Sequence, residues 1–244
     1  MSLSVLSSDV HARANYLKAN HVFASLSPES LHSLAEQALP TRVRRGATLW
    51  HEGDPSHKLV QVVRGRLLAH KLSLDGNVAY FRISTAGDLL GLSSLARVDH
   101  RGGGHAASPT HQTTVTARDE CIVLTIECSV VQALMAEESA LTRRILWEMQ
   151  HRIQALIDDL FAERTQRGAL VLANKLLQMA AMEGTTSGRV HLDYSQAELA
   201  GFTGLSSRNI NKFLAELPAV TTSNGRRGVR IERVEHLQTF VRNS

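Results

Sequence analysis

The stretch LDYSQAELAGFTGLSSRNINKFLAEL, residues 192–217, decides the fold. Its apolar residues fall close to one face of each of two short helices if the chain breaks at Gly204. Ser195 can cap the first helix, and Glu198 follows at the spacing of a capping box. Gly204 then supplies a turn, and Ser206 can cap the second helix. We therefore predict a helix-turn-helix.

The second helix of this pair presents a polar surface. Its hydroxyl, amide, guanidinium and ammonium groups suit the edges of bases and the phosphates of DNA. The alternative is a helical hairpin whose polar side simply faces water. We expect contacts with DNA from both helices and from the segment that follows them, at Ser195, Gln196, Ser206, Ser207, Arg208, Asn209, Asn211, Lys212, Arg226 and Arg227.

A hairpin signal follows the helix-turn-helix directly. Asn224-Gly225 lies between alternating apolar and polar residues, which is the strongest short-range signal for a β-hairpin. Arg226 and Arg227 fall at its tip, where they would reach a phosphate backbone or a minor groove. A basic hairpin in this position is a wing; the alternative is a solvated basic loop.

Length and composition are those of a globular protein that is too long to be a winged helix alone. The 244 residues suggest one large domain or two small ones, and 43% of them are hydrophobic and 20% charged. No run approaches the roughly 20 apolar residues that span a bilayer, and the N-terminus lacks the basic and apolar regions of a signal peptide. We therefore expect a cytoplasmic protein with no membrane partner.

The net charge of +4 is distributed unevenly along the chain. From Gly168 onward the basic residues outnumber the acidic ones, so most of the excess lies in the part that contains the helix-turn-helix. This distribution fits a polyanion that binds at one end of the chain.

Neither cysteine nor histidine spacing indicates a metal site or an enzyme. Cys121 and Cys128 are seven residues apart on or beside one strand, so they should lie on opposite faces and form no bridge. Without a CxxC motif or a tight Cys/His quartet we infer neither zinc nor an iron–sulfur cluster. We interpret His100, His105 and His111 as solvated loop residues rather than ligands of a metal or haem. No catalytic motif is present, so the sequence predicts no enzyme.

Before the helix-turn-helix the residue pattern changes from helical to strand-like. Residues 9–39 have helical spacing. Between residues 43 and 126 short apolar runs alternate with turn residues, which favours an antiparallel roll or sandwich. Asp75-Gly76 predicts a tight hairpin, and residues 99–111, with three consecutive glycines, predict an irregular loop. The glycines that mark the turns are Gly46, Gly53, Gly65, Gly76, Gly87 and Gly91.

From residue 129 the apolar period becomes helical for about thirty residues. A helix of that length is roughly 45 Å long, which is more than a small roll can cover. A second copy of the same helix is the simplest partner for the apolar residues that the roll leaves uncovered, so we predict a homodimer. The alternative is that the helix's own domain covers all of its apolar residues. A further helix is expected over residues 169–182. The seam consists of Leu134, Leu141, Ile145, Met149, Ile153, Leu156 and Leu160.

Several short motifs occur in a characteristic order: Phe23-Ala24-Ser25-Leu26-Ser27-Pro28-Glu29, Glu52-Gly53-Asp54, Gly65, Asp75-Gly76, Ala86-Gly87-Asp88, Gly91, Val115-Thr116-Ala117 and the helix-turn-helix. In this order and spacing, from about Val22 to Leu237, the chain resembles the cyclic-AMP receptor protein/FNR (Crp/Fnr) superfamily of bacterial transcription regulators. The resemblance implies an α+β fold in three parts. An effector-sensing antiparallel β-roll with N-terminal helices would occupy residues 1–128, a long dimerisation helix 129–164, and a winged helix-turn-helix DNA-binding domain 165–244.

The effector segment departs from the nucleotide-binding members of this family. They have a glutamate directly after the glycine that corresponds to Gly91, and an arginine before a Ser/Thr-Ala pair, where this chain has Leu92 and His111. Leucine cannot accept a hydrogen bond from a ribose hydroxyl, and histidine is a weaker, pH-dependent substitute for a guanidinium group. We therefore expect cyclic AMP not to be the effector. The expected pocket residues are Gly91, Leu92, Ser93, Ser94, His111, Gln112 and Thr113.

The family implies a symmetric dimer on a two-fold related DNA site, an effector in the roll and RNA polymerase as a partner. Base contacts would come from Ser207, Arg208, Asn211 and Lys212, with Arg208 favouring guanine and Asn211 adenine. We interpret the chain as a sequence-specific DNA-binding transcription regulator. The alternative from another class is a ligand-sensing or scaffold protein whose winged domain binds a protein.

Overall fold

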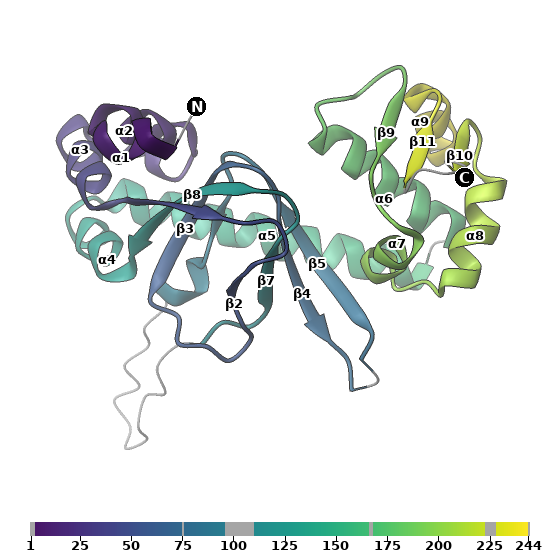
Figure 1. Ribbon diagram of the computed structural model, residues 1–244, viewed down its shortest axis with the longest axis horizontal. Helices are drawn as coiled ribbons and strands as arrows, with labels where there is room; N and C mark the ends of the chain where they lie inside the picture. Colours follow the sequence, from purple (N-terminus) through teal and green to yellow (C-terminus); the bar gives the residue numbers. More distant parts are fainter. Residues whose placement is uncertain (1–2, 75, 96–109, 166–167, 223–227, 244) are drawn as a thin grey trace. The chain divides into compact units, whose positions relative to one another are not determined.

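Figure 1 shows the computed structural model of the chain, which describes residues 3–74, 76–95, 110–165, 168–222 and 228–243. The chain divides into two compact units. The first comprises Met1–Lys71 and Phe81–Ile153, and the second Leu72–Tyr80 and Gln154–Ser244. Helices combined with antiparallel sheets in the first unit confirm the predicted fold class.

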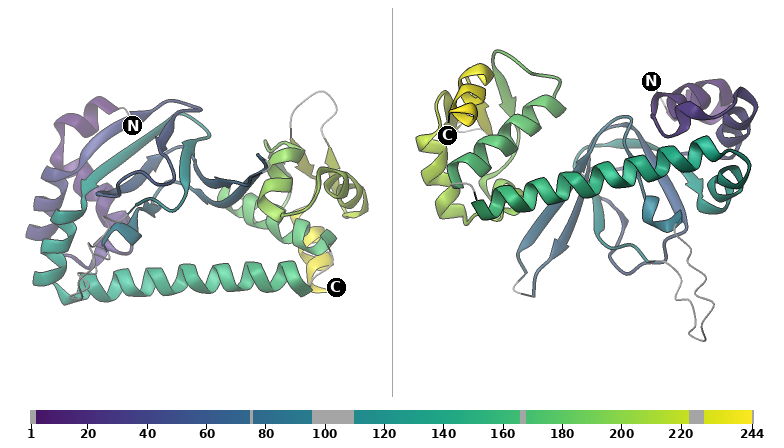
Figure 2. Two further views of the ribbon diagram at one scale, coloured as in Figure 1. Left: turned by 90° about the horizontal axis from the view of Figure 1, so that it is seen from below. Right: turned by 180° about the vertical axis from the view of Figure 1, so that it is seen from behind.

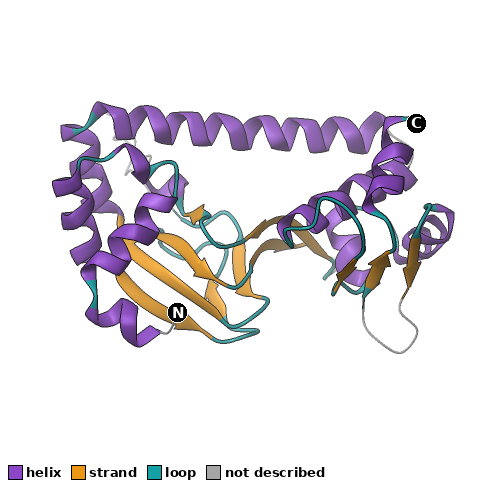
Figure 3. Cartoon of the chain, turned by 90° about the horizontal axis from the view of Figure 1, so that it is seen from above, coloured by secondary structure: helices purple, strands orange, loops and turns teal. Residues whose placement is uncertain are grey.

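Three short helices open the first unit: α1 (Leu3–Ser8), α2 (Val10–Ala19) and α3 (Pro28–Gln37), with a 3₁₀ turn at Phe23–Ser25. Asp9 caps α2 by accepting a hydrogen bond from the Ala12 amide at 3.1 Å. Ser27 caps α3 by accepting from the Ser30 amide at 3.2 Å, and Pro28 occupies the first helical turn. Figure 3 shows these helices alongside the strands of the roll.

Two four-stranded antiparallel sheets form the roll. The strand order is β1-β8-β3-β6 in one sheet and β2-β7-β4-β5 in the other. Val60 of β3 lies opposite both Thr125 of β8 and Leu90 of β6, so β3 is paired on both edges. The elements are β1 (Leu39–Val43), β2 (Thr48–Trp50), β3 (Lys58–Arg64), β4 (Leu67–Leu72), β5 (Val78–Ser84), β6 (Leu89–Leu90), a 3₁₀ turn (Leu92–Leu95), β7 (Thr114–Ala117) and β8 (Cys121–Glu127).

Strand β3 is apolar on both faces because each face meets a different core. Val60 and Val62 pack inside the roll among residues of both sheets. Leu59 and Val63 face the other way and pack in a cluster that includes Leu17 of α2. Because side chains alternate along a strand, β3 packs against the other sheet of the roll with one face and against the N-terminal helices with the other.

The six turn glycines of the roll all adopt the left-handed backbone conformation, with φ between 77° and 92°. At two of them the chain also passes close to itself. A Cβ atom on Gly65 would lie 2.6 Å from Cys121 Sγ and 2.7 Å from the Glu120 carbonyl oxygen. A Cβ atom on Gly91 would lie 2.5 Å from the Lys58 carbonyl oxygen. These two turns therefore exclude any side chain.

The helical segment after the roll is two helices, so the prediction of one helix over residues 129–164 is wrong. Helix α4 spans Cys128–Glu137 and α5 spans Ser139–Thr165, and Figure 2 shows α5 as a single continuous helix. The chain leaves the helical conformation at Glu138. The Glu138 carboxylate accepts hydrogen bonds from the amide and the hydroxyl of Ser27, at 3.3 and 3.2 Å. A tertiary contact of this kind leaves no trace in apolar spacing.

The roll covers only part of the predicted apolar seam. Leu141 and Ile145 are 0% and 3% exposed and belong to the core of the first unit. Ile153, Leu156 and Leu160 are 50%, 55% and 48% exposed. The expectation that the roll leaves much of this helix uncovered is therefore confirmed.

The second unit contains the predicted helix-turn-helix. A Cβ atom on Gly168 would lie 2.4 Å from Cε2 of Phe213, so α6 begins in direct contact with α8. The three strands pair in the order β10-β11-β9. Its elements are α6 (Gly168–Met182), β9 (Val190–Leu192), α7 (Gln196–Thr203), α8 (Ser207–Glu216), β10 (Val220–Thr222), β11 (Val229–Ile231) and α9 (Val234–Arg242).

Two negative expectations can be compared with the structure. Cys121 and Cys128 are both buried and free, as predicted. Among the residues that the structure describes, no helix has the length and hydropathy needed to cross a bilayer.

We predict that Gly65→Ala destabilises the roll more than Gly46→Ala does. Both glycines have a positive φ, which costs an alanine about 1 kcal/mol, but only Gly65 has atoms within 4 Å of the added Cβ. Overpacking at Gly65 should add about 1–3 kcal/mol. Urea unfolding of the full chain measures both changes, and equal losses for the two variants would contradict the predicted contact.

Candidate nucleic-acid interface and effector site

The first helix of the helix-turn-helix begins at a complete capping box. The Ser195 hydroxyl accepts a hydrogen bond from the Glu198 amide at 3.2 Å, and the Glu198 carboxylate accepts one from the Ser195 amide at 2.8 Å. The helix ends at Gly204, whose φ of 69° provides the left-handed turn. The Thr203 hydroxyl donates to the Leu199 carbonyl at 2.7 Å and is buried. These contacts fix where the second helix starts.

Helix α8 exposes a row of polar side chains along one face. Ser206 caps it by accepting a hydrogen bond from the Asn209 amide at 3.3 Å. Ile210 and Leu214, 0% and 3% exposed, anchor the opposite face in the core of the unit. The Lys212 ammonium lies 3.9 Å from the Glu216 carboxylate, yet the Lys212 side chain remains 67% exposed. The exposed polar residues are Ser206, Ser207, Arg208, Asn209, Asn211 and Lys212.

The strands of the predicted wing are present. β10 and β11 pair antiparallel, with Val220 opposite Ile231. The expected tip residues Arg226 and Arg227 lie outside the described residues. Ser195 and Gln196, the expected contacts at the start of α7, are partly exposed.

Arg230 is a cation of this region that the sequence reasoning did not select as a site residue. It is exposed on β11, and its Cα is paired with that of His191 on β9. The alternation of Val229, Arg230 and Ile231 is the signal that places the arginine on the solvent side of the sheet. Its guanidinium lies on the exposed face of the sheet, 3.9 Å from the Glu232 carboxylate.

The expected effector residues divide into buried and exposed ones. Leu92, Ser94 and His111 are 3%, 1% and 7% exposed, whereas Ser93 and Gln112 are exposed to solvent. Gly91 precedes a 3₁₀ turn that contains three of these residues. The Leu92 side chain packs in the core between the roll and the N-terminal helices, and it has no polar group that could bind a ligand.

Ser56 and Trp50, which the sequence reasoning did not select, join the buried effector residues. The hydroxyls of Ser56 and Ser94 are hydrogen-bonded to each other, and Ser56 Oγ lies 3.2 Å from His111 Nδ1. The Trp50 and His111 rings stack with centroids 4.1 Å apart and planes 7° apart. The Trp50 indole nitrogen donates to the Thr113 carbonyl at 3.1 Å. One aromatic stack therefore links β2 to the start of β7.

His111 is buried, so its interpretation as a solvated loop histidine is wrong. Burial lowers the pKa of His111 below its ordinary value of 6.5; the charge of Asp54 opposes this shift and that of His57 adds to it. The imidazole is therefore held in its neutral form. His100 and His105 lie outside the described residues.

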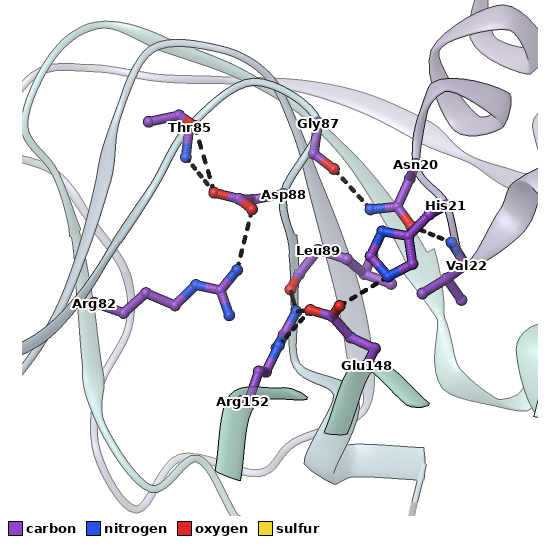
Figure 4. Close-up of polar contacts among 10 residues, drawn as sticks. All are labelled: Asn20, His21, Val22, Arg82, Thr85, Gly87, Asp88, Leu89, Glu148 and Arg152. Atoms are coloured by element: carbon purple, nitrogen blue, oxygen red, sulfur yellow. Dashed lines mark hydrogen bonds and ion pairs between the residues drawn. The ribbon is translucent and has the colours of Figure 1, made fainter. Parts of the chain in front are cut away.

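Figure 4 shows a cluster of charged side chains around the turn that contains Gly87 and Asp88. The Arg152 guanidinium of α5 donates to the Leu89 carbonyl at 2.6 Å and to the Glu148 carboxylate at 2.6 Å. The Arg82 guanidinium donates to the Asp88 carboxylate at 3.1 Å. Burial lowers the pKa of Arg152, and the nearby charge of Arg82 lowers it further. The Arg152 guanidinium nevertheless remains charged at neutral pH, because arginine does not lose its proton in that range.

Within the described ranges, no three His, Cys, Asp or Glu side chains lie together in a way that could hold a metal ion.

Comparisons with known proteins agree with this architecture. Residues 40–138 match the cyclic nucleotide-binding domain. A CRP-like cAMP-activated global transcriptional regulator of Mycobacterium tuberculosis is 26% identical over 202 residues, which cover 80% of this chain and 84% of the relative.

Solved structures of similar fold cover nearly the whole chain. FixK2 from Bradyrhizobium japonicum gives a TM-score of 0.67 at 18% identity, covering 83% of this chain and 96% of FixK2. A transcriptional regulator of the Crp/Fnr family from Eubacterium rectale gives a TM-score of 0.70 at 17% identity, and the match covers 92% of this chain and 99% of that regulator. The described residues thus form an antiparallel roll, a long helix and a helix-turn-helix unit. The chain is similar to Crp/Fnr regulators in sequence and in fold.

We predict that acidification destabilises the fold through His111. Folding lowers the pKa of His111, so the unfolded chain protonates this side chain at a higher pH than the folded protein does. Above about pH 6.5, the ordinary pKa of histidine, His111 is neutral in both states and the folded protein has its full stability. That stability is lost as the pH falls toward the lowered pKa of the folded state. Thermal unfolding of the wild type, measured from about pH 7.5 down to about pH 5, should show this loss of stability.

His111→Gln removes the titrating group and should flatten that profile. His32→Gln is the matched control, because the His32 side chain is 58% exposed on α3. An unchanged pH profile in His111→Gln would contradict the assignment.

Proposed function

We propose that the chain is a sequence-specific DNA-binding transcription regulator that acts as a homodimer. The observation that carries this proposal is the exposed polar face of α8, which includes Ser207, Arg208, Asn211 and Lys212, on a fully capped helix-turn-helix. A CRP-like transcriptional regulator among its relatives supports the same function. RNA polymerase is then the natural partner, and the cytoplasm the natural location.

In this proposal α8 enters the major groove with its N-terminal half. Arg208 donates two hydrogen bonds to a guanine and Asn211 pairs with an adenine, and each such contact is worth about 1–3 kcal/mol of discrimination. Ser195 and Gln196, at the start of α7, contact phosphates, as do Arg226 and Arg227 in the wing. Phosphate contacts fix orientation, while the contacts of α8 read sequence.

The proposed dimer contact is an apolar stripe on α5. Leu146, Ile153, Ile157 and Leu160 are spaced by seven, four and three residues and are 61%, 50%, 52% and 48% exposed. This is the spacing of a coiled-coil seam. Burying each side chain fully against a partner would contribute roughly 1.5–3 kcal/mol. A two-fold axis along this stripe would present two α8 helices to half-sites about one helical turn apart.

We further propose that cyclic AMP is not the effector. Leu92 lies in an apolar core where the nucleotide-binding relatives have a glutamate. His111 stands in the position of their arginine and is already engaged by Ser56 and Trp50. An effector of another chemical class, or none, accounts better for these residues.

We predict that Arg208→Ala relaxes sequence preference, by about 1–3 kcal/mol between the best and the worst sites. Arg227→Ala should instead weaken binding to every sequence and reduce the salt dependence, because it removes a phosphate contact. Fluorescence anisotropy on a panel of random-sequence duplexes at several salt concentrations measures both.

Arg242→Ala is the control for a lost surface charge, because Arg242 is exposed in the last turn of α9. If Arg208→Ala weakens all duplexes equally, Arg208 does not read bases. If the wild type shows no salt-dependent binding to any duplex, the proposed function is wrong.

We predict that Ile157→Glu converts the dimer to a monomer, since it places a charge in the centre of the stripe. Ala155→Glu is the matched control: Ala155 is exposed half a helical turn away on the same helix. Light scattering gives the mass directly, to be compared with 26.8 kDa for one chain. A dimer that persists in Ile157→Glu would exclude this face as the contact.

A further inference from the structure

Three turns of the roll meet at one of its ends. The Gly46 amide donates to the Ala117 carbonyl at 2.7 Å, so the turn between β1 and β2 is bonded to the end of β7. The Arg118 amide donates to the Arg66 carbonyl at 2.9 Å, which joins the turn after β7 to the turn between β3 and β4. These bonds hold three segments of the chain together. We call the surface that they form the basic end; it consists of residues 42–47, 64–66 and 118–120.

The basic end carries a large excess of positive charge. It contains six arginines and two carboxylates, which leaves four positive charges without a negative counterpart in these segments. That excess is as large as the net charge of the whole chain, which is +4. The arginines are Arg42, Arg44, Arg45, Arg64, Arg66 and Arg118, and the carboxylates are those of Asp119 and Glu120.

Asp119 is surrounded by three of these arginines. Its carboxylate accepts from Arg66 Nε at 2.5 Å and from Arg66 Nη2 at 3.1 Å. The hydrogen bonds from Arg66 lower the pKa of Asp119 below its ordinary value. The charges of Arg118 and Arg45 lower this pKa further, so their side chains lie near the same carboxylate.

Glu120 lies between two arginines of different strands. Arg42 of β1 and Arg64 of β3 are both paired in register with Ile122 of β8. The Arg42 guanidinium is hydrogen-bonded to the Glu120 carboxylate, and Arg64 Nη2 lies 3.7 Å from it. The Arg42 and Arg64 side chains nevertheless remain 58% and 59% exposed. Glu120 therefore positions two guanidinium groups without covering them.

The composition of the basic end fits the phosphate backbone of a nucleic acid better than the surface of a protein. A guanidinium group can bind a phosphate through two parallel hydrogen bonds. Interfaces between proteins have an apolar or aromatic centre, whereas protein–DNA interfaces are more polar and more positive. Among the described residues, none of the large apolar side chains that are exposed belongs to the basic end. The bonded turns also place the charges in advance, which lowers the cost of binding.

We propose that the basic end of the roll is a second surface for duplex DNA, which binds phosphates without reading sequence. This inference goes beyond the proposed function, which assigns the contacts with DNA to α7, α8 and the wing. Each phosphate that an arginine neutralises releases counterions, so this surface adds to the salt dependence of binding. Asp119 and Glu120 limit its strength, because each occupies guanidinium groups that DNA would otherwise bind.

The test is the binding of the full-length protein to a random-sequence duplex at several salt concentrations. The double variant Arg44→Ala/Arg45→Ala removes two exposed charges from one turn. Each lost phosphate contact reduces the slope of log affinity against log salt concentration by about 0.9, so the slope should become shallower by about two. Arg44→Lys/Arg45→Lys keeps both charges and should retain the wild-type slope. Arg143→Ala, which removes an exposed charge from α5, is the control and should also retain it.

Glu120→Gln tests the same surface in the opposite direction. It removes the negative charge that holds Arg42 and Arg64, so the affinity for duplex DNA should rise by roughly two- to fivefold. Its thermal stability should stay close to that of the wild type, because the ion pairs that it breaks are exposed. A residue that served only the fold would give no such gain in affinity.

An unchanged slope in Arg44→Ala/Arg45→Ala would overturn the second surface, and so would an affinity that does not rise in Glu120→Gln. Polyglutamate is the probe for the other class of partner. If the double variant loses binding to polyglutamate while its salt slope on DNA is unchanged, the basic end binds an acidic protein and the proposal is wrong.

The outcomes separate this inference from the proposed function. If the double variant has a shallower slope but Arg208→Ala leaves the sequence preference unchanged, the second surface stands and the proposed reading of sequence by α8 fails. If Arg208→Ala relaxes the preference and the double variant has the wild-type slope, the proposed function stands and the second surface fails.

Discussion

Helix α5 is the constraint on which the rest of the molecule depends, because its two parts have opposite surroundings. Leu141 and Ile145 are buried in the core of the first unit, whereas Leu146, Ile153 and Ile157 remain about half exposed or more. Exposed apolar side chains that line up along one helix are typical of a surface that a partner covers. The same helix carries Glu148 and Arg152, which bind the turn before the effector segment. One helix therefore carries both the proposed dimer contact and the contact with the sensor.

The roll is similar to the cyclic nucleotide-binding domain over residues 40–138, and the residues expected to form its pocket contact other residues of the chain. Leu92 contributes to an apolar core, and His111 is held neutral between Trp50 and Ser56. The guanidinium groups of Arg82 and Arg152 lie near the turn before Gly91, and each is paired with a carboxylate. Under the proposed function, regulation would therefore work through the arrangement of this hydrogen-bond network and not through a charged ligand.

Much of the fold follows from local signals in the sequence. Ser195, Glu198 and Gly204 mark the helix-turn-helix, because capping and left-handed turns depend on neighbouring residues. The six turn glycines mark the roll for the same reason. The helix break at Glu138 was not predicted from the apolar spacing, and the contact that Glu138 makes there is with Ser27, more than a hundred residues away in sequence. The burial of His111 and the pairing of His21 with Glu148 likewise depend on contacts made only after folding. The exposure of the polar side chains on α8 was therefore predictable, because it depends on one element, whereas contacts where several elements meet were not.

The central claim is that two copies of this chain read a two-fold related DNA sequence. Selection of bound duplexes from a random pool, followed by sequencing, tests it most directly. The account predicts enrichment of an inverted repeat with half-site centres about one helical turn apart. Guanine and adenine should dominate the positions that face Arg208 and Asn211. A pool that shows no enrichment, or a single unrepeated half-site, would contradict it.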